Sequence, residues 1–250
     1  MRTVYPLPLP MPNRLRTTLR SIAARLLPSA CALCGAAAAD GLCGGCEAQF
    51  FRRRPTRCAR CANLLPHQGG GAVCGACLKA PPAFDATWVA ADYVPPVDQL
   101  VLALKFGHSL ALAPLLARQL HMMLPPSVDL PQMLLPVPLA LGRLAERGFN
   151  QSLEIARHLS RLLAIPFEPR LAIRTRETAT QSLLPLPARR DNVRRAFTLD
   201  GAVIGRIRGQ HVGLVDDVMT TGETLNELAA VCKRFGAARV TNLVFARALP

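Results

Sequence analysis

The sequence predicts an α/β domain built on a parallel sheet, preceded by a smaller cysteine-rich unit. The chain has 250 residues, enough for one domain of about 150 to 170 residues and a second, smaller unit. Eight of its nine cysteines lie between residues 31 and 77. From about residue 86 onward, strand-like and helix-like segments alternate, as they do where crossovers join parallel strands.

The first 28 residues are expected to form a tail that contains an amphipathic helix. Basic and apolar residues recur there at helical spacing, namely Arg14, Arg16, Arg20 and Arg25 among Leu15, Leu19, Ile22 and Leu26. A helix packed on the protein body and one that binds a membrane surface or a partner both fit this pattern. A secretory signal does not fit, because the segment lacks a compact apolar run and a small-residue cleavage site.

The charge of the chain suggests a polyanionic partner. The formal net charge is +14 and the pI is near 10.4, which favours nucleic acid, an anionic membrane surface or a phosphorylated substrate. No apolar run reaches the roughly 18 to 20 residues that a bilayer crossing needs. We therefore expect a cytoplasmic protein without a transmembrane segment.

Cysteines with a fixed spacing predict the small unit, a double zinc ribbon over residues 29–82. Four pairs share the same two-residue gap: Cys31/Cys34, Cys43/Cys46, Cys58/Cys61 and Cys74/Cys77. Such pairs aim two thiolates at one ion, and two pairs complete the tetrahedral shell of structural Zn²⁺. We expect sequential sites, the first four cysteines holding one ion and the last four another. An interleaved arrangement, a disulfide framework, and redox or iron–sulfur use are the alternatives.

Between the two expected zinc sites the chain is rich in arginine. The cluster consists of Arg52, Arg53, Arg54, Arg57 and Arg60. Contact with a nucleic-acid backbone and a solvated basic face are equally compatible with it.

The larger domain, residues 83–250, is predicted from alternating elements. Strands are expected at 86–93, 133–138, 211–216 and 239–246, and helices at 96–106, 110–124, 149–163 and 223–235. Ligands of such sheets bind beyond the carboxyl ends of the strands.

One of these strand ends carries the most informative segment. Asp216 and Asp217 follow the apolar strand, and Thr220, Thr221, Gly222 and Thr224 open the next helix. Backbone N–H groups of a glycine-containing turn at a helix N-terminus bind anions, and threonine hydroxyls add donors for a phosphate. Adjacent carboxylates accept hydrogen bonds from ribose hydroxyls or approach hydrated Mg²⁺. A simple helix cap would not require two aspartates.

This segment resembles the fingerprint of the type I phosphoribosyltransferases. The resemblance implies a type I phosphoribosyltransferase-like parallel sheet with flanking helices and a hood. It also implies a ligand, 5-phosphoribosyl-1-pyrophosphate or a related ribose phosphate, bound with Mg²⁺. Asp216 and Asp217 take the catalytic positions, and the ligand-binding positions are Val218, Met219, Thr220, Thr221, Gly222, Glu223 and Thr224. Of these, Glu223 is the weakest candidate for chemistry, because a first-turn carboxylate can simply stabilise the helix start.

Two further blocks are similar to the ComF/GntX family, whose members place a double zinc ribbon ahead of the transferase-like domain. Residues 135–139, followed by Arg143, Arg147, Asn150 and Gln151, look like its pyrophosphate-facing loop. On a helix, Arg143 and Arg147 would share one face. The second block looks like the hood, although a solvated connector also fits it; its candidates are Thr178, Gln181, Arg189, Arg190 and Asn192. Lys105 also matches a family position.

The resemblance to this family implies a role in competence, DNA uptake or DNA utilisation. It also implies single-stranded DNA and a DNA-uptake helicase or translocase as partners. Two functions remain open: an enzyme that transfers phosphoribosyl to an unidentified acceptor, and a non-catalytic ligand sensor that binds single-stranded DNA. The few aromatic residues, 5% of the chain, count against base stacking in the second.

Overall fold

The computed structural model describes residues 29–66, 72–175, 195–201 and 204–249. The expected N-terminal helix and the hood candidates Thr178, Gln181, Arg189, Arg190 and Asn192 lie outside these residues. The chain divides into two compact units, Met1–Glu47 and Ala48–Pro250. The first cysteine group belongs to the smaller unit and the second group to the larger. The boundaries predicted at residues 28/29 and 82/83 stay a prediction.

In the smaller unit a short antiparallel pair precedes the start of a helix. Strand β1 (Ser29–Ala30) pairs with β2 (Ala37–Ala38), and helix α2 (Gly44–Phe50) begins directly after Cys43 and continues past Glu47, the last residue of this unit. Gly35 and Gly41 have φ values of 75° and 83°, the left-handed region that glycine enters without steric cost. These turns bring the two cysteine pairs of this unit together.

The larger unit contains the predicted parallel sheet. Its strands are β3 (Ala86–Asp92), β4 (Met133–Pro136), β7 (His211–Met219) and β8 (Arg239–Arg247), in the order β3-β8-β7-β4. Every neighbouring pair is parallel. The central strands β7 and β8 are buried along nearly their whole length, as expected for a sheet covered on both faces. The predicted α/β class is therefore confirmed.

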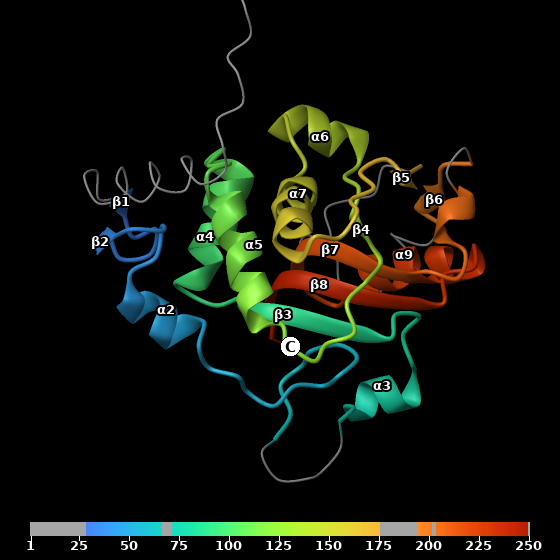
Figure 1. The fold of residues 1–250 in the computed structure, drawn as a ribbon, viewed down its shortest axis with the longest axis horizontal. Helices are drawn as coiled ribbons and strands as arrows, with labels where there is room; N and C mark the ends of the chain where they lie inside the picture. The colour runs from blue at the N-terminus through green and yellow to red at the C-terminus, as the bar shows by residue number, and fades with distance from the viewer. Residues whose placement is uncertain (1–28, 67–71, 176–194, 202–203, 250) are drawn as a thin grey trace, which may run out of the picture. The chain divides into compact units, whose positions relative to one another are not determined.

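Helices cover both faces of this sheet (Figure 1). On one face α5 (Leu112–Met123) and α7 (Gln151–Leu163) pack side by side, and α4 (Val97–Phe106) packs against α5. On the other face α9 (Glu223–Arg234) packs against β7 and β8. All four helices lie where the sequence predicts them. Among the described residues, no helix has the length and apolar character needed to cross a membrane.

The structure also contains elements that the sequence pattern did not predict. They are α3 (Gly75–Lys79), α6 (Leu141–Arg147), the antiparallel pair β5 (Ala172–Arg174) and β6 (Phe197–Leu199), and a 3-10 helix at Ile204–Ile207. In addition, β7 does not end at Asp216 as expected but continues to Met219. It does so because β8 goes on pairing with it as far as Arg247.

Candidate functional site

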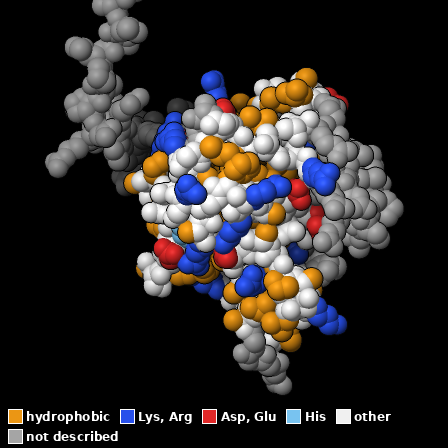
Figure 2. All heavy atoms as spheres, turned by 90° about the vertical axis from the view of Figure 1, so that its right-hand side faces the viewer, with side chains coloured by type: hydrophobic (Ala, Val, Ile, Leu, Met, Phe, Trp, Pro, Cys, Tyr) orange, Lys and Arg blue, Asp and Glu red, His pale blue; other side chains and the backbone are white. Residues whose placement is uncertain are grey.

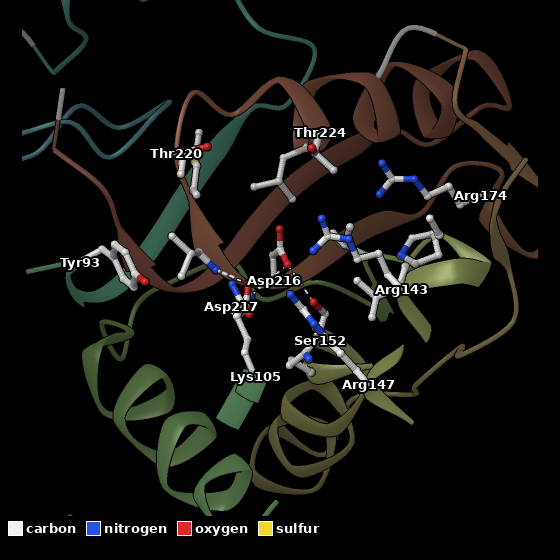
Figure 3. Close-up of a pocket in the computed structure, with 18 of the residues that line it drawn as sticks. Tyr93, Lys105, Arg143, Arg147, Ser152, Arg174, Asp216, Asp217, Thr220 and Thr224 are labelled. Carbon is white, nitrogen blue, oxygen red and sulfur yellow. Dashed lines mark hydrogen bonds and ion pairs between the residues drawn. The ribbon is translucent and has the colours of Figure 1, made fainter. Parts of the chain in front are cut away.

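A pocket of about 540 Å³ lies at the carboxyl ends of the parallel strands (Figure 3). This is the edge at which ligands of α/β sheets bind, and the volume suits a small molecule. Eleven of the residues predicted from the sequence line the pocket: Lys105, Arg143, Arg147, Gln151, Asp216, Asp217, Val218, Met219, Thr220, Gly222 and Thr224. They come from α4, α6, α7, β7 and the start of α9, so the fold gathers them from distant parts of the chain.

The two carboxylates of β7 lie at the centre of the pocket and have different partners (Figure 3). Asp216 Oδ1 accepts a hydrogen bond from Ser152 Oγ at 2.7 Å. Asp217 Oδ2 forms an ion pair with Lys105 Nζ at 2.8 Å, and its Oδ1 accepts the backbone N–H of Val218. Because each carboxylate is held by a different neighbour, the pair is fixed in place before any ligand arrives.

Asp216 is an unusually weak acid in this setting. Burial raises the pKa of Asp216 to about 7, and the negative charge of Asp217 adds to the rise. The Ser152 hydroxyl and the Lys105 ammonium group oppose the rise without cancelling it. The carboxyl group therefore changes its charge near neutral pH, which is where a group that responds to a ligand or a cation is useful.

Opposite the carboxylates lies the start of α9, with Thr220 and Thr224 on the pocket wall (Figure 3). Gly222 is the residue before the helix and has a φ of 86°, a conformation that favours glycine. A Cβ at this position would lie 2.5 Å from Met219 Cε. The first N–H groups of a helix have no partner within the helix, so this end offers donors and a positive dipole to an anion.

The predicted arginine pair lies on another wall of the pocket. Arg143 and Arg147 are both on α6, the helix that the shared-face argument requires but that the sequence pattern did not predict, and both line the pocket. The Arg147 guanidinium lies 5.1 Å from the centre of the Phe106 ring and donates to Gln151 Oε1 at 3.2 Å. These contacts orient Arg147, and burial lowers its pKa.

Asn150 and Ser152 connect the loop after β4 to the carboxylates. Asn150 caps α7, its side-chain oxygen accepting the N–H of Ser152 at 3.0 Å, and its Nδ2 donates to the Val137 carbonyl at 3.0 Å. Asn150 does not line the pocket. Its contacts instead place Ser152, whose hydroxyl reaches Asp216.

Some predicted residues lie apart from the pocket, and other lining residues were not predicted. Thr221 and Glu223 belong to the loop but not to the lining, and Glu223 is the first residue of α9. Tyr93, Ser152 and Arg174 line the pocket without having been chosen as site residues. A signal existed for each: Tyr93 ends the predicted first strand, Ser152 follows the predicted Asn150 and Gln151, and Arg174 lies four positions before the hood candidate Thr178.

The cysteines form two separate groups that fit tetrahedral Zn²⁺. The groups are Cys31, Cys34, Cys43 and Cys46, and Cys58, Cys61, Cys74 and Cys77, each with sulfur atoms within 4.8 Å of one another. Sequential pairing of the motifs is therefore confirmed. The Sγ atoms of Cys61 and Cys74 are 3.6 Å apart, as are those of Cys34 and Cys43. Sulfur atoms around Zn²⁺ at 2.3 Å would be separated by about 3.8 Å.

One thiol in each group is prepared for metal binding. Burial raises the pKa of Cys58, but N–H groups of Cys61 and Cys74 donate to its sulfur and outweigh burial, so the pKa falls to about 7. The pKa of Cys31 falls to about 6 for the same reason. Metal ligands must be thiolates, so these donors favour the bound form.

The basic cluster after the first cysteine group is partly structural. Arg57 forms an ion pair with Asp92 at 2.8 Å and donates to the Ala62 carbonyl, and Arg54 donates to the Met122 carbonyl. On the face drawn in Figure 2, basic side chains lie at several places with acidic and apolar ones between them. That face carries no continuous basic stripe among the described residues.

Comparison with known families gives a match for the cysteine-rich part of the chain and another for the α/β part. The model of the double zinc ribbon domain matches residues 22–78, and that of the phosphoribosyl transferase domain matches residues 149–249. The DNA utilization protein YhgH of Escherichia coli O157:H7 is 38% identical over 221 residues, which are 86% of this chain and 95% of that protein. Competence protein F of Haemophilus influenzae is 33% identical over 216 residues, which are 84% of this chain and 92% of that protein.

Among solved structures, glutamine phosphoribosylpyrophosphate amidotransferase from B. subtilis aligns with a TM-score of 0.36 and 22% identity, covering 54% of this chain and 26% of that chain. The family assignment rests on the sequence relatives. On their similarity over most of both chains, this protein belongs to the ComF/GntX family of phosphoribosyltransferase-like proteins, with a double zinc ribbon ahead of the phosphoribosyl transferase domain.

Proposed function

We propose that this protein binds 5-phosphoribosyl-1-pyrophosphate, or a closely related ribose phosphate, together with Mg²⁺, and acts in DNA uptake or DNA utilisation. One observation carries the ligand assignment. Asp216 and Asp217, the helix start at Thr220 to Thr224, and the arginines of α6 face one another across a single pocket. The names of the relatives, a DNA utilization protein and a competence protein, support the biological role.

Each group of the ligand has a chemical counterpart in the pocket. The 5-phosphate suits the N-terminus of α9 with Thr220 and Thr224, where N–H groups and hydroxyls converge. The ribose hydroxyls suit Asp216 and Asp217 as acceptors. The diphosphate suits Arg143 and Arg147, whose guanidinium groups bind two phosphate oxygens at a time. Roles for Thr178, Gln181 and the hood arginines stay a prediction.

In this proposal Mg²⁺ binds beside the carboxylates. Mg²⁺ in phosphate sites keeps several waters and takes one or two carboxylates together with substrate oxygens. Asp217 already pairs with Lys105, whereas Asp216 accepts a hydrogen bond from the neutral Ser152 hydroxyl, so Asp216 is the better candidate. When bound, the ion would neutralise charge on the diphosphate.

If the protein is catalytic, its residues act by position and charge. Transfer breaks the bond between the anomeric carbon and the pyrophosphate oxygen, and the electron pair leaves with pyrophosphate. A lone pair of the acceptor forms the new bond, and the acceptor proton passes to solvent. Asp216 and Asp217 hold the ribose while positive charge develops on it, and Arg143 and Arg147 stabilise the departing diphosphate.

Calorimetric titration with phosphoribosyl pyrophosphate and Mg²⁺ tests the ligand assignment. Wild type should give a saturable heat, and the double variant Asp216→Asn/Asp217→Asn should lose it. Glu146→Gln serves as the control, because Glu146 is an exposed carboxylate of α6 outside the pocket lining. Equal heats for wild type and the double variant would show that the pocket assignment is wrong.

A second candidate function is a ligand sensor that binds single-stranded DNA. The net charge of +14 and the name of the E. coli relative favour it. Binding to phosphates releases counterions, so the affinity should fall steeply as salt is raised. Fluorescence anisotropy with a labelled oligonucleotide measures this dependence, and an affinity that does not change with salt would remove the candidate.

A further inference from the structure

Arg247 is a buried arginine that the proposed function does not use. It is the last residue of β8, only 5% of its surface is exposed, and it lies outside the pocket lining. A buried guanidinium group is costly unless its donors are satisfied. Four backbone carbonyls accept hydrogen bonds from this one, and three of them, those of Cys61, Met219 and Thr220, belong to two functional parts of the larger unit.

On one side Arg247 contacts the second cysteine group. Its Nε donates to the Cys61 carbonyl at 3.0 Å. With Zn²⁺ bound, four thiolates would give this group a net charge of about −2, so the guanidinium cation also complements it electrostatically. Arg247 thus fixes the turn that carries two of the four metal ligands.

On the other side Arg247 holds the end of β7 where the phosphate loop begins. Its Nη1 donates to the Met219 carbonyl at 3.0 Å and to the Thr220 carbonyl, and also to Ala248. In a trans peptide the C=O and the following N–H point in opposite directions. By holding these two carbonyls, Arg247 turns the N–H groups of Thr220 and Thr221 away from itself, as an anion site on the other side of the loop requires.

The Cys58–Cys61 turn is itself attached firmly to the sheet. The Ala59 carbonyl accepts the N–H of Thr87 in β3, and Arg57 joins Asp92 to the Ala62 carbonyl. Cys58, Cys61 and Cys77 pack in the same apolar cluster as Leu225 and Leu228 of α9. Packed and hydrogen-bonded contacts therefore run without a break from the metal site to Arg247.

We propose that Arg247 is a positioning residue that couples the second cysteine site to the phosphate loop, so that metal at this site and ribose phosphate in the pocket stabilise each other. The inference rests on the proposed function for its ligand. Coupling between two sites is reciprocal, so whatever the metal adds to ligand affinity, the ligand adds to metal affinity. It can therefore be measured without any catalytic assay.

The experiment follows zinc release from the full-length protein to a chromogenic chelator, with and without phosphoribosyl pyrophosphate and Mg²⁺. In wild type, the ligand should slow the release of one of the two zinc ions by about fivefold or more. Arg247→Lys keeps a cation but cannot reach the carbonyls on both sides. It should retain both zinc ions, bind the ligand about fivefold more weakly by calorimetry, and lose the protection.

Arg239→Lys is the matched control, because Arg239 begins the same strand at the opposite edge of the sheet and pairs there with Asp129. It should behave as wild type. A wild-type protein that binds the ligand without any change in zinc release would overturn the coupling alone, even if Arg247→Lys failed to fold. A wild-type protein that binds no ligand would overturn the proposed function as well. Protection of equal size in wild type and Arg247→Lys would exclude Arg247 as the link.

Discussion

Asp216 is the residue at which function and stability conflict. Its pKa is raised to about 7 by burial and by Asp217, whereas an unfolded aspartate titrates near 3.8. The folded protein therefore binds more protons than the unfolded chain between these values, and the stability provided by the protonated form is lost as pH rises from about 4 through 7. We infer that Asp216 is a functional residue, since a neutral side chain would fill a purely structural role at this buried position without the cost in stability.

The first prediction concerns Asp216→Asn. The variant should gain stability over wild type at about pH 8, by at most about 4 kcal/mol; the gain should be smaller near pH 5 and should nearly vanish below about pH 4. It should also lose ligand binding, because an amide cannot replace an ionised carboxylate toward ribose hydroxyls and Mg²⁺. Urea unfolding of both proteins at several pH values, with calorimetric titration at pH 8, measures the two effects.

The comparison between the two proteins is needed because zinc thiolates also titrate when the pH is lowered, and this contribution is common to both. In wild type, ligand affinity should fall as the pH is lowered through 7. Equal stability of wild type and Asp216→Asn at every pH would contradict the raised pKa, whatever the ligand does.

The second prediction concerns Gly222, which starts α9 with a φ of 86°. In Gly222→Ala, a left-handed conformation costs about 1 to 2 kcal/mol and the new methyl group collides with Met219 Cε. Ligand affinity should fall roughly tenfold, since a cost of 1.4 kcal/mol on the bound geometry is one factor of ten. Gly205→Ala is the control, because Gly205 has open space around its Cβ position and no positive φ; a similar loss in both variants would argue against a local effect.

At the scale of elements, regular apolar patterns made most of the fold predictable. The strands β3, β4, β7 and β8 were predictable because apolar residues make up more than half of each, as in sheets covered on both faces. The end of β7 was placed too early because two aspartates look like a strand end, while the pairing that extends it comes from β8. Whether a polar segment is paired depends on its neighbour, which a local pattern does not contain.

The same limit applies to the site. The loop from Asp216 to Thr224 was found because its residues are consecutive. The Ser152 contact joins residues 64 positions apart, and the Arg247 contact to Cys61 joins residues 186 positions apart. The helix that carries Arg143 and Arg147 is short and has no buried residue, so it leaves no apolar periodicity in the sequence.

The third prediction belongs to α7. Asn150→Ala removes the cap of this helix and the bond to the Val137 carbonyl, so unfolding free energy should fall by about 1 to 2 kcal/mol. Ligand affinity should fall too, because Ser152 and with it Asp216 lose their fixed position. Asn150→Ser restores the cap acceptor but not the Val137 bond. It should therefore recover most of the stability and little of the affinity, and equal recovery of both in urea unfolding and calorimetry would argue against a role for the loop.

At the scale of the whole molecule, the two cysteine sites have unequal relations to the α/β core. The first site lies in Met1–Glu47, and the second lies in Ala48–Pro250 together with the sheet. Cys77 packs in one apolar cluster with residues of β7 and α9, so a metal bound at the second site would be attached directly to the core that forms the pocket. We therefore expect loss of the second metal, more than loss of the first, to weaken the α/β core.

The last prediction compares the fourth ligand of each site, Cys46→Ser and Cys77→Ser. Both side chains are buried to a similar degree, with 8% and 7% of their surfaces exposed. Elemental analysis should find two zinc ions per wild-type chain and close to one in each variant. Only Cys77→Ser should lower the main unfolding transition, by a free energy on the order of several kcal/mol, because the folding of the large core depends on that metal. If the main calorimetric unfolding transition shifts equally in the two variants, both metal sites support the core. The division of the chain at residue 47 would then not correspond to a difference in stability.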